Sequence, residues 1–247
     1  MNQIRIGASG WHYKHWIGRF YPAKLPASRM LEYYIEHFDT VELNNTFYRL
    51  PPESALLSWR DSTPDDFRFA IKGSRFLTHM KKLKDPEQGI ARFFERIDIL
   101  GRKAGPVLFQ LPPGWPLNVD RLERFLAALP RRRTYAFELR NDSWNCEEVL
   151  AVLRAHNAAY CIFDLAGYQS PLFVTCRTVY VRLHGPGGKY QGDYPAAALA
   201  AWAGRIVKWF EEDRDVWVYF DNDDSGYAPK NALDLKARVS GYLSKTK

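Results

Sequence analysis

The feature that most constrains this chain is an alternation of short apolar strands with amphipathic helices. Strands are predicted at residues 4–7, 40–44, 67–72, 107–111, 135–140, 160–164, 178–184 and 216–221. Apolar residues at helical spacing follow most of them, as in Ile90, Phe93, Phe94 and Ile97. A strand, a loop and a helix in repeated succession are typical of parallel βα units.

Eight such units in 247 residues match the size of a (β/α)8 barrel. We therefore predict an α/β fold, a single TIM-type (β/α)8 barrel that forms one domain over residues 1–247. The stretch between Asp164 and Thr178 is too short for a full helix with two loops, so the sixth βα connection is predicted to be abbreviated. The alternative is an open doubly wound sheet, whose usual Gly-x-Gly-x-x-Gly turn is missing from Gly7–Gly10.

Composition limits the environment and the partners. The net charge of +7 favours nucleic acid or a small anion as partner, or reflects only a basic soluble protein. The three cysteines have no metal-binding spacing, which predicts a reduced, cytoplasmic protein. Neither a signal peptide nor an apolar run of roughly 20 residues is present, so no membrane association is expected.

Strand parity selects the candidate functional residues. In a barrel of this type, side chains on the inward face near the carboxyl ends of the strands line the active-site mouth. The polar inward positions predicted in this way are Ser9, Glu42, Asn44, Lys72, Gln110, Glu138, Arg140, Asp164, Arg182, His184, Tyr219 and Asp221. Buried charges are costly unless they pair or bind something. A ligand site is favoured over a self-paired salt-bridge network that only fills the barrel.

Two kinds of site fit this set. A divalent metal is one alternative, and its candidate ligands are Glu42, Glu138, Asp164, His184 and Asp221. A phosphate or carboxylate clamp is the other, held by the cations Lys72, Arg140 and Arg182 while a carboxylate and an imidazole move protons. Because three interior cations would repel a metal ion, we favour the anion.

The strongest expectation concerns Arg140 and Arg182, two guanidiniums that could grip one anion. The glycine-rich run from Gly185 to Gly192 would bring backbone N–H groups to the same anion. Arg182→Ala is expected to leave the protein folded, on the premise that Arg182 lies in a cluster of cations.

Several stretches resemble the YecE-like family, the domain of unknown function 72. They are Gly7–Trp11, Phe20–Pro22, Val41–Tyr48, Leu108–Pro113, Glu138–Arg140, Tyr180–Gly185 and Tyr219–Asn222. The resemblance runs nearly end to end. It implies a TIM-type barrel of one domain, and it supplies no reaction.

The function predicted from the sequence is an enzyme that acts on a small anionic substrate by general acid/base chemistry at the barrel mouth. The predicted catalytic residues are Glu42, Glu138, His184 and Asp221. The predicted substrate-binding residues are Trp11, Asn44, Tyr48, Lys72, Gln110, Arg140, Arg182, Tyr190 and Asn222. One alternative is a nucleic-acid-binding protein or metal-dependent phosphodiesterase, for which the run Lys81, Lys82 and Lys84 is the candidate contact. A ligand-binding protein without turnover is the other.

Overall fold

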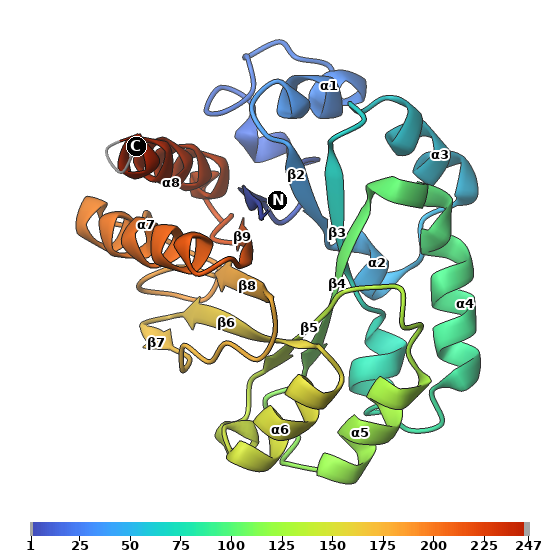
Figure 1. Cartoon of the computed structure of the whole chain (residues 1–247). Coiled ribbons are helices and arrows are strands. Elements are labelled where there is room, and N and C mark those ends of the chain that lie inside the picture. The colour runs from blue at the N-terminus through green and yellow to red at the C-terminus, as the bar shows by residue number, and fades with distance from the viewer. Residues whose placement is uncertain (1, 245–247) are drawn as a thin grey trace. The chain divides into compact units, whose positions relative to one another are not determined.

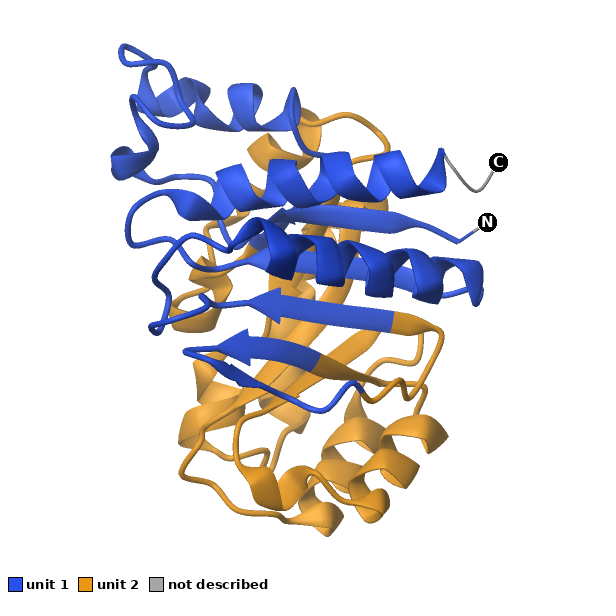
Figure 2. Cartoon of the chain, turned by 90° about the vertical axis from the view of Figure 1, so that its left-hand side faces the viewer, with its two compact units in different colours: residues 1–42, 162–172, 179–247 blue, residues 43–161, 173–178 orange. Residues whose placement is uncertain are grey.

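The computed structural model describes residues 2–244. The chain divides into two compact units, coloured separately in Figure 2. The first unit comprises residues 1–42, 162–172 and 179–247, and the second comprises residues 43–161 and 173–178. The prediction that residues 1–247 form one domain stays a prediction.

The first unit contains the first and last strands of the chain. Its hydrogen-bonded order is β1, β9, β8, β6, and the short β7 pairs antiparallel with β6. The strands that lie wholly in this unit are β1 (Ile4–Ala8), β7 (Tyr168–Gln169) and β9 (Asp215–Phe220). Three more strands belong to it in part: β2 (Thr40–Leu43) up to Glu42, β6 (Ala159–Leu165) from Ile162, and β8 (Thr178–Leu183) from Val179. The helices are α1 (Met30–Ile35), α7 (Ala196–Glu211) and α8 (Tyr227–Leu243). Helices α7 and α8 run side by side (Figure 1).

The second unit contains the central strands. Its order is β6, β5, β4, β3, β2, and β3, β4 and β5 pair in parallel. The strands are β3 (Arg68–Lys72), β4 (Ala104–Leu111) and β5 (Tyr135–Leu139), with the remainders of β2 and β6. The helices are α2 (Asn45–Tyr48), α3 (Glu53–Asp61), α4 (Glu87–Ile97), α5 (Val119–Ala128) and α6 (Glu147–Ala155), with a π-helix at Phe76–Met80.

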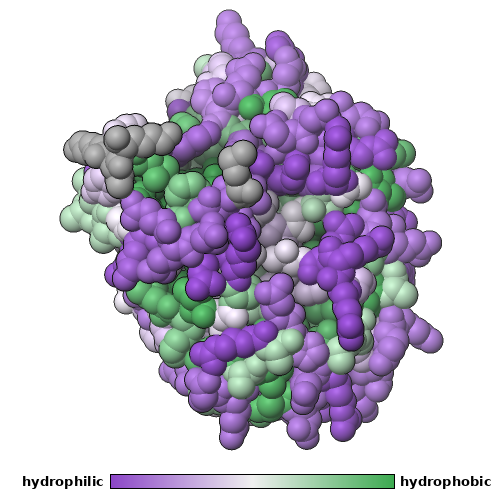
Figure 3. Space-filling model, in the orientation of Figure 1, coloured by the Kyte–Doolittle hydropathy of each residue, from purple (hydrophilic) through white to green (hydrophobic). Residues whose placement is uncertain are grey.

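Apolar side chains explain why these segments fold as they do. On β8, Val179, Val181 and Leu183 alternate with Tyr180 and Arg182, and all five are buried. On α4 the buried residues are Ile90, Phe93, Phe94 and Ile97, the face predicted from their spacing. Hydrophobic residues also remain scattered among hydrophilic ones on the face shown in Figure 3, as is normal for a protein surface.

The predicted fold class is confirmed: eight parallel strands alternate with helices in a TIM-like barrel fold. The abbreviated sixth connection is also confirmed, because β7 and irregular backbone link β6 to β8 where the other connections carry helices. Thr78 and His79 lie in the π-helix. The four-residue helix α2 was not predicted.

Within residues 2–244, the structure has no helix with the length and hydrophobicity needed to cross a membrane.

Candidate functional site

Polar side chains gather at the carboxyl ends of the strands in the first unit. We call this group the Arg182 network, and it consists of Ser9, Glu42, Arg182, His184 and Asp221. Parallel strands place them together, since Ser9 follows β1 and forms a parallel bridge with Glu42 of β2. Arg182 is on β8, His184 follows β8, and Asp221 follows β9. All five were predicted from strand parity, and all are buried.

The centre of the network is the guanidinium of Arg182, which has no exposed surface. Its Nε donates to both carboxylate oxygens of Glu42, at 3.2 and 3.1 Å, and its Nη2 donates to Glu42 Oε1 at 2.7 Å. Nη2 also donates to Asp221 Oδ2 at 3.0 Å. The planar fork of an arginine suits such bidentate pairing with a carboxylate. Arg182 is therefore held by two carboxylates.

This pairing contradicts the expectation that Arg182 lies in a cluster of cations. Its ion-pair partners include the carboxylates of Glu42 and Asp221. The reason given for expecting Arg182→Ala to stay folded therefore does not hold, since that change would strand two buried carboxylates. Whether the variant folds stays a prediction.

The imidazole of His184 is fixed by two contacts. Its Nε2 lies 3.2 Å from Nη1 of Arg182, and its Nδ1 lies 3.1 Å from Oδ2 of Asp221. Because a guanidinium can only donate, Nε2 must accept, and Nδ1 then donates its proton to Asp221. The two contacts thus fix the orientation of the His184 ring. The ring of Tyr190 stands edge-on to it, with centroids 5.3 Å apart.

A layer of buried tyrosines supports the network. Tyr180 donates its hydroxyl to Oε2 of Glu42 at 2.7 Å, and the hydroxyl of Tyr219 lies 2.6 Å from Oγ1 of Thr40. Burial, reinforced for Tyr180 by the negative charge of Glu42, raises the pKa of both phenols well above its ordinary value. Both phenols therefore stay protonated, and Tyr180 serves Glu42 as a hydrogen-bond donor.

Asp164 lies at the end of β6 in the same unit. Burial raises the pKa of its carboxyl group, while His184 and Arg205 oppose the rise. Its Oδ1 is buried and has no hydrogen-bond partner among the described residues. Asp164 was predicted as a metal ligand. Nowhere in residues 2–244 do three His, Cys, Asp or Glu side chains come together as a metal-binding group.

Three further residues predicted to bind substrate belong to the first unit. Asn222 is buried, and its Nδ2 donates to the carbonyl of Gly192 and to Oδ1 of Asn231, each at 2.8 Å. Asn222 thus anchors the glycine-rich loop. Trp11 is nearly buried, whereas Tyr190 remains partly exposed.

A second group of polar side chains, which we call the strand-end group, lies in the second unit. It consists of Lys72, Gln110, Glu138 and Arg140, all predicted from parity. Strand register aligns Lys72 with Leu108 and Gln110 with Glu138, so the group spans three adjacent parallel strands. Arg140 Nε donates to Glu138 Oε1 at 2.5 Å, so these two residues form an ion pair.

Aromatic rings adjoin the cation of Lys72. Its Nζ lies 4.6 Å from the centroid of the Phe47 ring, a cation–π contact. Phe47 also meets the rings of Tyr48 and His79 edge-on, each at 5.0 Å. Of the two other predicted residues here, Asn44 is half-buried directly before α2, and the Tyr48 side chain is largely exposed.

His79 was not predicted as a functional residue. Burial, followed by the positive charges of Arg75, Lys72 and Arg140, lowers its pKa from 6.5 to about 4. Its Nδ1 lies 2.9 Å from Oγ1 of Thr78. Three cations acting on one imidazole mark a positively charged region around His79. The sequence showed a Thr-His pair before a lysine run, and only the fold brings Lys72 and Arg140 near it.

The low pKa of His79 gives a testable pH dependence. The unfolded chain binds a proton at this histidine near pH 6.5, whereas the folded chain does so only near pH 4. We therefore expect His79 to contribute a loss of stability as the pH falls from 6.5 to 4. Urea denaturation at a series of pH values should show a smaller loss for His79→Gln than for wild type, and equal losses would contradict the assignment.

A histidine–aspartate pair in the first unit was also missed. His15 Nε2 lies 3.0 Å from Oδ2 of Asp223, and the indole N–H of Trp16 donates to Oδ1 of the same carboxylate. Burial raises the pKa of Asp223 to about 6. The two partners are 208 residues apart in sequence, so no local spacing could have revealed the pair.

Comparisons with known proteins place these observations in a family. A family model described as "Protein of unknown function DUF72" matches residues 5–246. The UPF0759 protein YecE of Escherichia coli K12 is 33% identical over 142 residues, which cover 57% of this chain and 50% of YecE. The match thus spans half the length of that relative. The UPF0759 protein YunF of Bacillus subtilis is 26% identical over 265 residues, covering 94% of this chain and 93% of YunF.

Solved structures share the fold. A DUF72 family protein from Thermotoga maritima superposes with a TM-score of 0.89 at 28% identity, covering 97% of this chain and 100% of its own. A DUF72 family protein from Enterococcus faecalis gives a TM-score of 0.80 at 22% identity, covering 96% of each chain. The second likeness bears on the fold alone.

Proposed function

We propose that this chain, which belongs to the DUF72 family, is an enzyme that binds a small phosphate- or carboxylate-bearing substrate at the carboxyl ends of β3, β4 and β5. The observation that carries the proposal is the strand register, which gathers Lys72, Gln110 and the Glu138–Arg140 pair at one end of three adjacent strands. A lysine and an arginine on strands that flank a third can hold one anion between them.

The charge balance of the second unit supports an anionic ligand. Lys72, Arg75 and Arg140 all act on His79, and Glu138 is the carboxylate of the strand-end group. Such an excess of positive charge attracts anions. Gln110 lies between the two charged strands, and its buried Oε1 has no hydrogen-bond partner in the described part of the chain. A hydroxyl group of the substrate would satisfy this oxygen.

Glu138 is the group that we propose for proton transfer. A bound anion would compete with Glu138 for Arg140, and a weaker contact with that guanidinium would make the buried carboxylate a stronger base. His184 and Asp221 in the first unit stay as a second proposed proton-transfer pair. We assign Arg182 and Glu42 to supporting that pair, because the guanidinium of Arg182 already donates to carboxylates.

The test is a titration of the His79 imidazole by NMR, with and without sulfate or phosphate at matched ionic strength. An anion bound beside Lys72 and Arg140 would offset their charge, so the His79 pKa is expected to rise from about 4 toward 6.5. The rise should disappear in Lys72→Met and in Arg140→Gln. Arg132→Gln, which alters an exposed arginine of the same unit, is the matched control and should keep it.

Two results would refute the proposal. One is a His79 pKa that does not change when sulfate or phosphate is added. The other is an equal rise in Lys72→Met and in wild type, which would mean that the anion binds somewhere else.

A further inference from the structure

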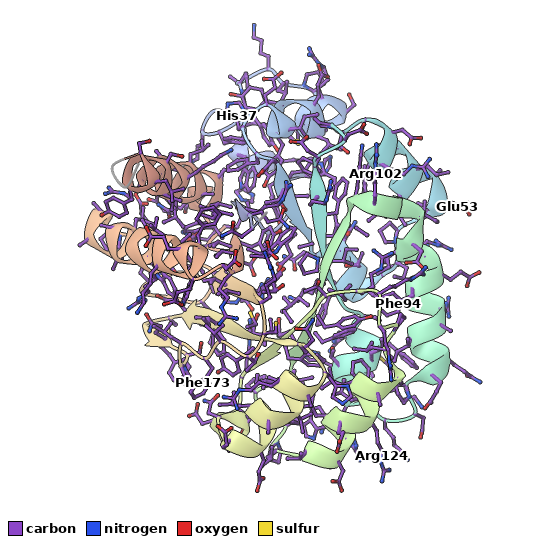
Figure 4. All side chains as sticks on the ribbon, in the orientation of Figure 1. His37, Glu53, Phe94, Arg102, Arg124 and Phe173 are labelled. Carbon is purple, nitrogen blue, oxygen red and sulfur yellow. The ribbon has the colours of Figure 1, made fainter. Side chains whose placement is uncertain are left out.

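A groove of about 900 Å³ lies in the second unit, apart from the strand-end group. Residues of α2, α3, α4 and the π-helix line it. Glu53, labelled in Figure 4, lies at the start of α3 and borders the groove. None of Lys72, Gln110, Glu138 and Arg140 is among the lining residues, so the groove is a separate feature of the unit.

Two large aromatic side chains that line this groove are exposed to solvent. Tyr48 is 78% exposed and Phe76 is 44% exposed. Contact between apolar surface and water is unfavourable, so a ligand that covers both rings would gain free energy by removing them from water. The Tyr48 ring meets the Phe47 ring edge-on, with centroids 5.0 Å apart, and Phe76 is the first residue of the π-helix.

A glycine brings the π-helix close to α4. A Cβ atom on Gly89 would lie 2.6 Å from Cδ2 of Leu77 and 3.5 Å from Cε1 of Phe76. A side chain at position 89 would press on the end of the Leu77 side chain, so the glycine favours this close packing. The position of Phe76 at the groove is therefore built into the packing of the second unit.

Positive charge accompanies the rings. Arg49 and Arg92 are exposed in the groove, and the ammonium group of Lys81 lies 5.9 Å from the centroid of the Phe76 ring. Arg96 also lines the groove, where its Nη1 donates to the carbonyl of Pro51 at 2.7 Å. The three lining cations, Arg49, Arg92 and Arg96, outnumber the two lining carboxylates, Glu53 and Glu95.

We propose that this groove binds single-stranded nucleic acid, with Tyr48 and Phe76 stacking on bases while Arg49 and Arg92 neutralise phosphates. Exposed aromatic rings beside cations are the features with which proteins hold single strands without sequence preference. A duplex hides its base faces inside the stack and cannot use the rings in this way. The proposal does not rest on the anion site, and either one can fail alone.

The experiment measures fluorescence anisotropy of a labelled oligothymidylate of about 15 nucleotides in about 50 mM salt, with the full chain. Stacking contributes about 1–3 kcal/mol per base, so Tyr48→Ser and Phe76→Ser should each weaken binding by about tenfold. Tyr242→Ser removes a ring of α8 with an exposure close to that of Phe76 and is the matched control, expected to leave affinity unchanged. Arg49→Ala and Arg92→Ala should each lower the salt slope by about one.

Three outcomes would overturn the proposal. The first is no binding at about 100 μM protein. The second is salt-dependent binding that both serine variants retain, which would reduce the interaction to the general charge of the chain. The third is equal affinity for a duplex of the same length or for polyglutamate, since neither offers unstacked bases. Circular dichroism melts of each variant verify that the fold persists.

Discussion

Replacing Arg182 with alanine should lower the free energy of unfolding by about 3–5 kcal/mol, as expected when one partner of a buried ion pair is removed. Arg182 has no exposed surface and donates to Glu42 and Asp221. Its loss leaves the charge of Glu42 buried without a counter-ion. Urea denaturation at pH 7, with a constant m-value, measures the change.

Two variants distinguish burial of charge from loss of any ion pair. Arg154→Ala breaks the exposed pair with Glu147 and should change stability by no more than about 0.5 kcal/mol. Arg182→Met combined with Glu42→Gln removes both charges, so the double variant should be more stable than Arg182→Ala. A loss below about 1 kcal/mol in Arg182→Ala would show that the Arg182 network contributes little to stability.

Gly185→Ala should also be strongly destabilising, by about 2–3 kcal/mol, because the backbone after β8 has no room for a side chain. Gly185 has a φ of 118°, which residues with a side chain rarely adopt. A Cβ atom there would lie 2.1 Å from the carbonyl oxygen of Gln191, so the loop itself would have to move. Urea denaturation measures the loss, and limited proteolysis should show faster cleavage between residues 185 and 192.

The same loop provides the control. Gly187 has no heavy atom within 4 Å of an added Cβ, and its φ lies outside the left-handed region. Gly187→Ala should therefore leave stability within about 0.5 kcal/mol of wild type. Equal effects at positions 185 and 187 would contradict the steric explanation.

Much of the candidate site could be predicted from strand parity alone. Alternation along a strand fixes which side chains share a face, and this rule is enough to place Tyr180 and Arg182 opposite Val179 and Val181. Parallel strands then bring their carboxyl ends to one edge, as the register of Gln110 with Glu138 illustrates. Both rules are local, and both need only the residue order.

The sequence alone could not predict which charged side chains pair with one another. Strand parity predicted that Arg182 lies at a strand end, where several carboxylates and cations were candidate neighbours. The interpretation that Arg182 lies among other cations was wrong, because it pairs with carboxylates. Likewise, the pairing of His15 with Asp223 joins residues 208 positions apart. Distances of a few ångströms decide such pairs, and these depend on how elements pack.

The sequence by itself determined the alternation of strands and helices, the shortened sixth connection and which polar residues stand near strand ends, because periodicity and chain length are properties of neighbouring residues. Only the tertiary structure decided which of these charged side chains lie together. It paired Arg182 with carboxylates, and it surrounded His79 with Lys72, Arg75 and Arg140. The reason is physical: electrostatic interactions act through space and strengthen when water is excluded, so they follow from packing and not from position along the chain.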